Sequence, residues 1–302
     1  MTARVAVLCA VAALALAIAG CGSQSDAGSG GGGRSDRLVD FAKQPPYVNA
    51  LDIEPASGDF LLTTNRGFFR IDRDSDRVRP IQGRISAGEQ RATVGTFLEL
   101  TVEGPGRLVG SGHPDQEGAL PAFLGFIRSD DDGRTWRVVS RLGDADLHKI
   151  VLKHGRMYAF DAVLSALLVS RDGGRTFTEQ FTPRGLIIDF EVDPADPRHI
   201  VASNADELFR SRDGGASWRP IDRRQGIRLV WPAAGKLYRA LKDGAVQTSN
   251  DGGETWSSAG RVDGEPYKFK AVGADELYLA LSDGTIMHTT DAARTWETAF
   301  RP

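Results

Sequence analysis

The stretch Ser211-Arg212-Asp213-Gly214-Gly215-Ala216-Ser217-Trp218 decides the fold, because it is one of five related octapeptides in the chain. Each octapeptide begins with a hydroxyl residue, has Asp at its third position, and ends in an aromatic residue preceded by Thr or Ser. The closing aromatic residues are spaced 41, 41, 38 and 40 residues apart. A regular period of this length predicts a repeat protein.

The octapeptide has the composition of a hairpin turn. Gly214 and Gly215 can adopt positive φ angles, and Asp213 can accept hydrogen bonds from nearby backbone N–H groups. Alternating stretches that favour strands stand on both sides, Glu207 to Arg210 before the turn and Trp218 to Ile221 after it. The octapeptide is therefore predicted to join two antiparallel strands.

One period contains four short strand-like stretches, which is the strand content of a propeller blade. A sixth, eroded repeat precedes the five octapeptides, at Val48 to Ile81. The second repeat is longer than the others, with insertions around residues 82–91 and 112–123. We therefore expect an all-β, six-bladed propeller of four-stranded antiparallel blades. Arg37 to Lys43 could instead supply a strand that closes the ring, or part of a seventh blade. The expected blades run over residues 47–82, 93–140, 147–180, 185–222, 227–259 and 267–300.

The composition is that of a globular protein. Of 302 residues, 41% are hydrophobic and 25% are charged, which excludes a disordered or collagen-like chain. The net charge of -3 argues against a nucleic-acid partner, since such proteins carry a basic face. With 35 Gly and only 3 Met, the sequence favours strands and turns over helical bundles.

The N-terminal segment has the pattern of an export signal. Arg4 precedes an apolar run from Val5 to Ala19, so residues 1–20 are interpreted as a cleaved signal peptide. The sequence Leu16-Ala17-Ile18-Ala19-Gly20-Cys21 resembles the bacterial lipobox, which implies a lipid on Cys21. Residues 21–37 are then a lipidated, Gly/Ser-rich tether, and residues 38–302 the propeller domain. This predicts an extracytoplasmic protein anchored to a bacterial membrane, with inner and outer membranes both open.

The octapeptides resemble the Asp-box, or BNR repeat, of sialidases and related propellers. In that family the boxes lie on the rim and are structural, so a calcium site at these turns is not favoured. The same resemblance gives the aromatic residues that end the boxes a role in blade packing. The box residues to which we assign a structural role are Ser129, Asp131, Gly133, Trp136, Ser170, Asp172, Gly174, Phe177, Ser211, Asp213, Gly215, Trp218, Ser249, Asp251, Gly253, Trp256, Asp291 and Trp296.

A second resemblance is to exported bacterial propeller lipoproteins that are labelled sialidase-like or glycosylhydrolase. It rests on three stretches, residues 110–115, 146–148 and 158–161. Sialidase chemistry itself is not favoured. The arginine in Phe69-Arg70-Ile71-Asp72 recurs as Phe209-Arg210 in another blade, which indicates a repeat-wide structural residue.

Polar residues near the starts of first strands should converge on the central channel of a propeller. Asn49, His113 and His148, with the acids Asp115, Asp146 and Asp161 near them in sequence, could form a polar cup that binds a sugar or holds a metal. The alternative is a solvated His113 and a packed His148. Trp231 lies outside every box and is a candidate for a binding face. The full candidate set at the channel mouth is Asn49, His113, Asp115, Asp146, His148, Asp161 and Trp231.

These observations favour a binding module for cell-envelope glycan or for an exported protein partner, acting as a monomer. A sialidase-like glycoside hydrolase is the alternative, and a scaffold without a small ligand is a third possibility. We find no nucleophile elbow, phosphate loop or paired-cysteine metal motif. No cofactor is therefore predicted, and neither catalytic residues nor a metal site can be named from the sequence.

Overall fold

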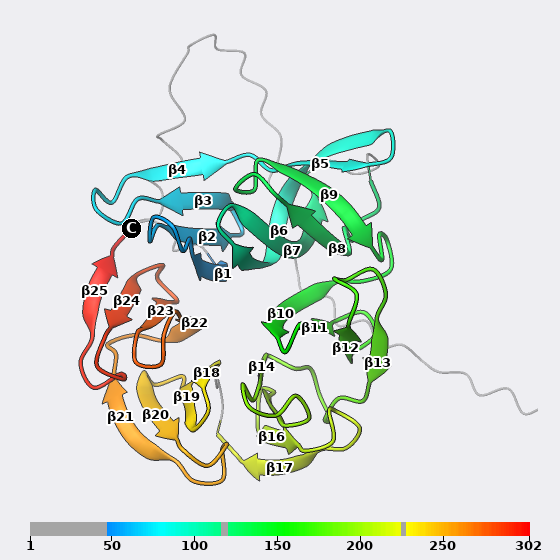
Figure 1. The fold of residues 1–302 in the computed structure, drawn as a ribbon. Helices are drawn as coiled ribbons and strands as arrows, with labels where there is room; N and C mark the ends of the chain where they lie inside the picture. Colours follow the sequence, from blue (N-terminus) through cyan, green and yellow to red (C-terminus); the bar gives the residue numbers. More distant parts are fainter. Residues whose placement is uncertain (1–46, 116–119, 225–227) are drawn as a thin grey trace, which may run out of the picture. The chain divides into compact units, whose positions relative to one another are not determined.

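The computed structural model of this chain describes residues 47–115, 120–224 and 228–302. These residues belong to one compact unit, Arg37–Pro302. The signal peptide, Cys21, the tether and the strand expected at Arg37 to Lys43 lie outside the described residues. All regular structure in the described part is β-strand (Figure 1). None of the described segments is a helix with the length and apolar character needed to cross a membrane.

Five sheets have four strands each, paired antiparallel in chain order, as expected for propeller blades. The first blade contains β1 (Val48–Ile53), β2 (Phe60–Thr64), β3 (Gly67–Ile71) and β4 (Val78–Ile81). The third contains β10 (Leu147–Lys153), β11 (Arg156–Asp161), β12 (Ala166–Ser170) and β13 (Thr178–Gln180). The fourth contains β14 (Asp189–Val192), β15 (Ile200–Ser203), β16 (Leu208–Ser211) and β17 (Arg219–Asp222). The last two contain β18 (Arg228–Ala233), β19 (Lys236–Ala240), β20 (Ala245–Ser249), β21 (Ser257–Arg261), β22 (Pro266–Ala271), β23 (Leu277–Leu281), β24 (Ile286–Thr289) and β25 (Glu297–Phe300).

The second repeat corrects the expectation of six four-stranded blades. It forms a closed, five-stranded sheet from β5 (Arg84–Ala87), β6 (Gln90–Gly104), β7 (Arg107–Pro114), β8 (Phe126–Ser129) and β9 (Thr135–Ser140). The insertion around residues 82–91 supplies β5, which pairs antiparallel with β6 and parallel with β9. Three register shifts in the pairing of β6 with β7 allow the long strand to bend enough for this closure.

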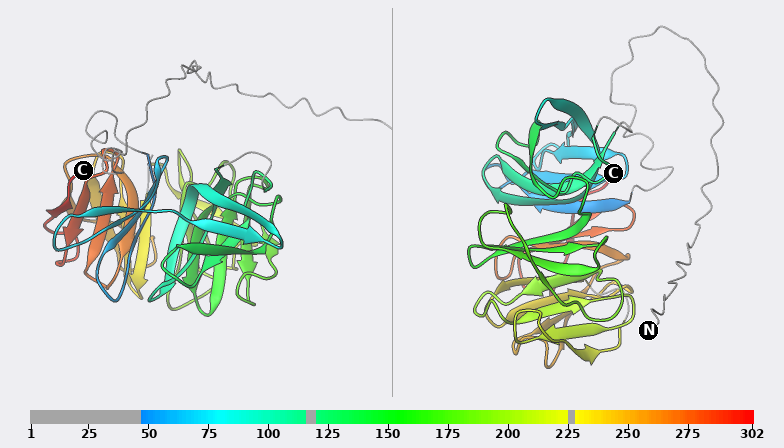
Figure 2. Two further views of the ribbon diagram at one scale, coloured as in Figure 1. Left: turned by 90° about the horizontal axis from the view of Figure 1, so that it is seen from above. Right: turned by 90° about the vertical axis from the view of Figure 1, so that its right-hand side faces the viewer.

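The six sheets form a ring around a central axis (Figures 1 and 2). The inner strand of each sheet contacts the inner strands of its two neighbours, in the order β1, β6, β10, β14, β18, β22 and back to β1. The described residues form no seventh sheet.

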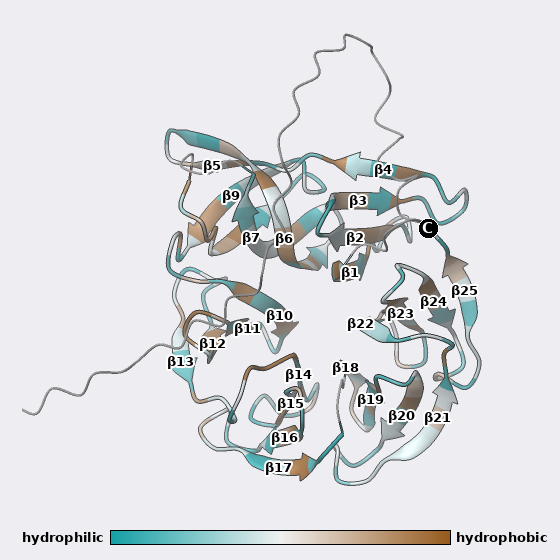
Figure 3. Ribbon diagram, turned by 180° about the vertical axis from the view of Figure 1, so that it is seen from behind, coloured by the Kyte–Doolittle hydropathy of each residue, from teal (hydrophilic) through white to brown (hydrophobic). Residues whose placement is uncertain are grey.

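Each pair of neighbouring sheets shares one apolar cluster. The ring closes between the first and last sheets, where Phe60 packs edge-on against Tyr278 with ring centroids 5.7 Å apart. In Figure 3 the inner strands β1 and β10 carry hydrophobic residues over part of their length, whereas the outer strand β13 is hydrophilic. Burial between sheets is the main force that holds such a ring together.

The five Asp-boxes lie at the turns between the third and outermost strands, as predicted. In the fourth blade, Ser211 Oγ donates to Asp213 Oδ1 over 2.8 Å and accepts the Gly215 N–H over 2.8 Å. Asp213 then accepts the Ser217 N–H and hydroxyl over 2.9 and 2.6 Å. The other boxes repeat the contacts to the Asp carboxylate, so this carboxylate closes its own turn in each box.

Each box also contacts the preceding blade. The Gly174 Cα lies so close to Phe126 that an added Cβ would be 2.2 Å from its ring, and one on Gly133 would be 2.4 Å from Phe68. Both glycines have positive φ angles. The boxes are therefore joints between neighbouring sheets as well as local turns.

Candidate functional site

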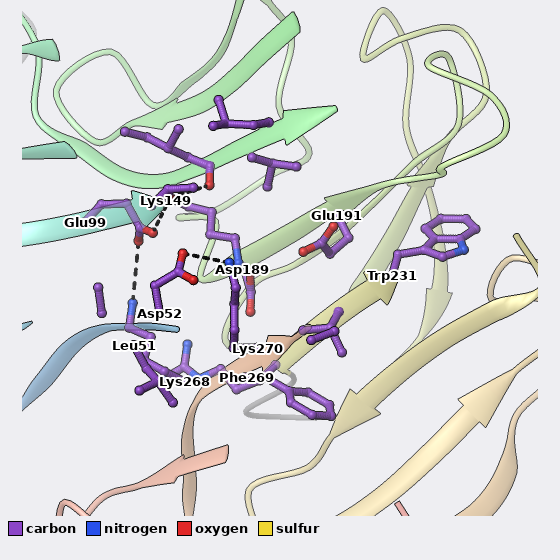
Figure 4. A pocket seen from close by; sticks show the side chains of 18 of the residues that line it. Leu51, Asp52, Glu99, Lys149, Asp189, Glu191, Trp231, Lys268, Phe269 and Lys270 are labelled. Atoms are coloured by element: carbon purple, nitrogen blue, oxygen red, sulfur yellow. Dashed lines mark hydrogen bonds and ion pairs between the residues drawn. The ribbon is translucent and has the colours of Figure 1, made fainter. Parts of the chain in front are cut away.

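A cavity of about 310 Å³ lies on the axis, lined by residues of all six inner strands. Nine charged side chains line it, five basic and four acidic, and several of them are labelled in Figure 4. They are Asp52, Glu99, Lys149, Lys153, Asp189, Glu191, Arg228, Lys268 and Lys270. Successive side chains of a strand point to opposite sides, so residues two apart point to the same side. Asp189 and Glu191 therefore both reach the channel, as do Lys268 and Lys270.

Three of the lysines form close ion pairs in the channel. Lys149 Nζ lies 2.9 Å from Asp189 Oδ1, and Lys270 Nζ lies 2.7 Å from Asp52 Oδ2. Lys153 Nζ lies 2.5 Å from Glu191 and also donates to the carbonyl oxygens of Val192 and Trp231 over 2.8 Å each. These lysines are fixed in place by the wall of the channel.

Asp52 and Asp189 make the same types of backbone contact, from different positions in their strands. Each accepts the N–H of the residue that follows it through Oδ1, over 2.7 and 2.8 Å. Each also reaches the next sheet through Oδ2, where Asp52 accepts the Val102 N–H and Asp189 accepts the Leu229 N–H, over 2.9 and 3.0 Å. The two carboxylates therefore join neighbouring sheets along the axis.

Glu99, Lys268 and Arg228 form a looser group. Glu99 Oε2 lies 4.0 Å from Lys268 Nζ, at the outer limit of an ion pair. Burial raises the pKa of Glu99 to about 7, against the opposing effect of Lys268 and Lys149. Burial also lowers the pKa of Lys268, and the nearby charge of Arg228 adds to that effect. Arg228 places its guanidinium 5.1 Å from the centre of the Tyr267 ring.

The predicted polar cup is assembled in part, and its residues are not among those that line the channel cavity. His148 Nε2 lies 3.0 Å from Asp146 Oδ2, and His113 Nε2 lies 3.7 Å from Asp146 Oδ1. Asp161 is fully buried and accepts the Asp146 N–H over 3.2 Å. Arg141 approaches Asp161 to 3.7 Å. The structure thus brings four of the seven predicted residues together between the second and third sheets.

The other three predicted residues lie apart from this group. Asp115 is exposed and accepts the Thr93 N–H over 3.2 Å. Asn49 lies in β1 and is half-buried. Trp231 is among the residues that line the channel cavity, while its ring is buried in the core between the fourth and fifth sheets and packs edge-on against His199 at 4.9 Å. In Figure 4 its indole points away from the channel.

Arg70 has a structural environment. It pairs with Asp59 at 2.6 Å and with Asp132, in the next box along the chain, at 3.3 Å. Arg210, its counterpart in the fourth sheet, likewise pairs with Glu254 of the following box. These contacts agree with the interpretation of Arg70 as a repeat-wide residue.

Within the described part of the chain, no group of three or more His, Cys, Asp or Glu side chains is arranged to hold a metal ion. Sequence reasoning missed the channel charges, although a signal was present. Charged and apolar residues alternate in Asp189-Phe190-Glu191-Val192 and in Lys268-Phe269-Lys270, which places the charges on one side of a strand.

Comparisons with known proteins agree with this architecture. Residues 182–301, which contain the fourth to sixth repeats, match the family model described as photosynthesis system II assembly factor YCF48. A stretch of 95 residues is 32% identical to the dispase autolysis-inducing protein of Streptomyces mobaraensis. That match covers 31% of this chain and 25% of the relative, so the chain spans about a quarter of the length of that relative.

Solved structures show the same fold at low sequence identity. The GH74 enzyme of Niastella koreensis is 15% identical, with a TM-score of 0.54 over 84% of this chain and 45% of that chain. YCF48 bound to D1 peptide is also 15% identical, with a TM-score of 0.51 over 84% of this chain and 82% of that chain. Together with the five boxes, these matches identify the protein as a β-propeller built from BNR-type repeats.

Proposed function

We propose that this chain is an extracytoplasmic binding module that recognises a charged segment of a polypeptide partner in its central channel. The observation that carries the proposal is the cavity itself, where every inner strand supplies lining residues and nine charged side chains of both signs line one space of about 310 Å³. Prearranged charges of both signs favour recognition of a polar, charged ligand over an apolar one.

The pairing of the carboxylates supports binding over hydrolysis in this channel. A glycoside hydrolase needs one carboxylic acid and one carboxylate that are free to act on the two sides of the scissile bond. Asp52, Asp189 and Glu191 are each held by a lysine at 2.9 Å or less. Asp52 and Asp189 also accept backbone N–H groups from two sheets, so their role in the channel is structural.

The class of partner is supported by the comparisons. The matched family is described as an assembly factor, and one similar structure holds a bound peptide. For a propeller with a charged channel, an extended polypeptide segment is a ligand of suitable size and polarity. A cell-envelope glycan is the alternative ligand, and the exposed His148 beside Asp146 is where a sugar hydroxyl could bind.

The proposed location follows from the N-terminal sequence. We infer that residues 1–20 direct export and that Cys21 carries the lipid, with residues 22–37 as the tether. Metabolic labelling with radioactive palmitate tests this inference. The label should enter the full-length protein and be absent from the Cys21→Ala variant. Equal labelling of both proteins would contradict the anchor.

The binding function is tested with the full-length protein and a displayed library of random peptides. Selected peptides should bind the wild type and lose about tenfold or more in affinity for the Arg228→Gln variant, since a charge-assisted contact is removed. Arg261→Gln is the matched control, because Arg261 is exposed at the end of the outer strand β21. Peptides that bind all three proteins equally would refute channel recognition. Turnover of a fluorogenic glycoside that Arg228→Gln abolishes would favour the hydrolase alternative.

A further inference from the structure

Six of the nine charged side chains that line the channel form close ion pairs with one another, and three do not. Lys149, Lys153 and Lys270 each have an acid within 2.9 Å, and those acids are Asp189, Glu191 and Asp52. The remaining group contains two cations, Arg228 and Lys268, and one acid, Glu99. Within the described residues, the ion pair of this group joins Lys268 to Glu99 over 4.0 Å.

Arg228 is the cation with the fewest internal partners. In the described part of the chain, no carboxylate lies within ion-pair distance of its guanidinium. Its Nε atom is buried and makes no hydrogen bond to any described residue. The guanidinium stacks against the Tyr267 ring, and this contact fixes the guanidinium plane. The N–H donors of the guanidinium form a planar fork that remains available to a ligand. Such a fork matches the two oxygens of a carboxylate.

An anion bound by Arg228 and Lys268 would lie near one acidic side chain, that of Glu99. Glu99 faces Lys268 on β22, Lys149 on β10, Asp189 on β14 and Asp52 on β1, and Thr101 of its own strand donates to it over 3.4 Å. Lys149 and both aspartates are already paired with other groups. Lys268 is therefore the cation that Glu99 and an incoming anion would share.

We propose that one carboxylate group binds in the channel between Arg228 and Lys268, and that Glu99 takes up one proton from solvent when this site fills. The arriving carboxylate competes with Glu99 for the Lys268 ammonium, and two carboxylates that share one cation repel each other in a buried site. Protonation of Glu99 removes that repulsion and leaves one negative charge between the two cations. The proposal deepens the proposed function and rests on it, because the carboxylate is assigned to the polypeptide partner.

Calorimetry on the full-length protein tests the site with three probes. These are acetyl-triglycine with a free carboxylate, the same peptide with a C-terminal amide, and acetate. The free-carboxylate peptide should bind, and the amide should not. Acetate should bind more weakly than the peptide, because it lacks the backbone that the channel would contact. Equal affinity of acetate and peptide would refute the assignment to a polypeptide.

The proton is measured by comparing the binding enthalpy in buffers of different ionisation enthalpy. Uptake should be about half a proton at pH 7, since Glu99 has its pKa near 7 in the free protein. The affinity should fall about tenfold between pH 6 and pH 8. Binding of the peptide without proton uptake in the wild type would overturn the coupling, and this result does not depend on any variant.

Variants separate the two parts of the proposal. Arg228→Gln should abolish binding of the free-carboxylate peptide at every pH. Glu99→Gln should retain binding and lose both the proton uptake and the pH dependence. Arg261→Gln should behave as the wild type. If library peptides require Arg228 but the free-carboxylate probe does not bind, the carboxylate site is refuted while the proposed function stands. If neither binds, both fail.

Discussion

The substitution Gly174→Ala tests whether the Asp-boxes hold neighbouring sheets together. Gly174 has a φ angle of 84°, a conformation that costs an Ala residue about 1–2 kcal/mol. Its added Cβ would lie 2.2 Å from Cε1 and 2.4 Å from Cδ1 of Phe126, a fully buried residue of the preceding sheet. Displacing a well-packed ring costs about 1–3 kcal/mol more. We therefore expect the free energy of unfolding to fall by about 2–5 kcal/mol.

Gly214→Ala is the matched control for this substitution. Gly214 lies in the box of the next blade with a φ angle of 79°, and an added Cβ would meet no atom within 4 Å. It should lose only the backbone cost of about 1–2 kcal/mol. Urea unfolding followed by tryptophan fluorescence gives both values. Equal losses for the two variants would refute the view that the box glycine packs on the preceding sheet.

Further predictions concern charge and core packing. Asp52→Ala should destabilise the fold by about 2–4 kcal/mol in urea unfolding, because Lys270 and the Val102 N–H lose their acceptor; the exposed Asp243→Ala should change stability by less than about 0.5 kcal/mol. Hydrogen bonds from Ser217 and Ser211 lower the pKa of Asp213 to about 2, so its stabilisation is complete above about pH 4 and should be lost as the pH falls through 2. The urea midpoint should therefore drop over that range, and less in Asp213→Asn; an unchanged midpoint would contradict this. Trp231→Ala should cost about 3–5 kcal/mol, as for a core aromatic residue, and a neutral effect would argue for a surface role.

The repeat architecture could be predicted from the sequence because its signals are local. The turn chemistry of each box is contained in eight residues, and the period between boxes shows how many residues one sheet uses. The closed second sheet could not be predicted in this way. Its closure depends on the pairing of Arg84 in β5 with Thr135 in β9. These residues lie far apart in the chain, and no sequence pattern near either of them indicates that they pair.

The candidate site was predictable only in part. His148 and Asp146 stand at the start of a first strand and lie beside His113, but none of the three is among the residues that line the channel cavity. Trp231 also lies in a first strand, but its side chain points to the side of β18 that packs against the fourth sheet. The ion pairs of the channel join residues as far apart as the first and the sixth repeat, such as Asp52 with Lys270, and only the closed ring brings them together.

Site-specific photo-crosslinking in the native cell shows whether the channel binds a polypeptide. A crosslinking amino acid is placed at Val272, which lines the channel and is 45% exposed, and, as a control, at Phe181, which is 75% exposed beyond the outer strand β13. We expect a discrete polypeptide adduct from Val272, identified by mass spectrometry, which disappears when Arg228→Gln is added and is absent from Phe181. No polypeptide adduct at Val272, or the same adduct from both positions, would contradict it.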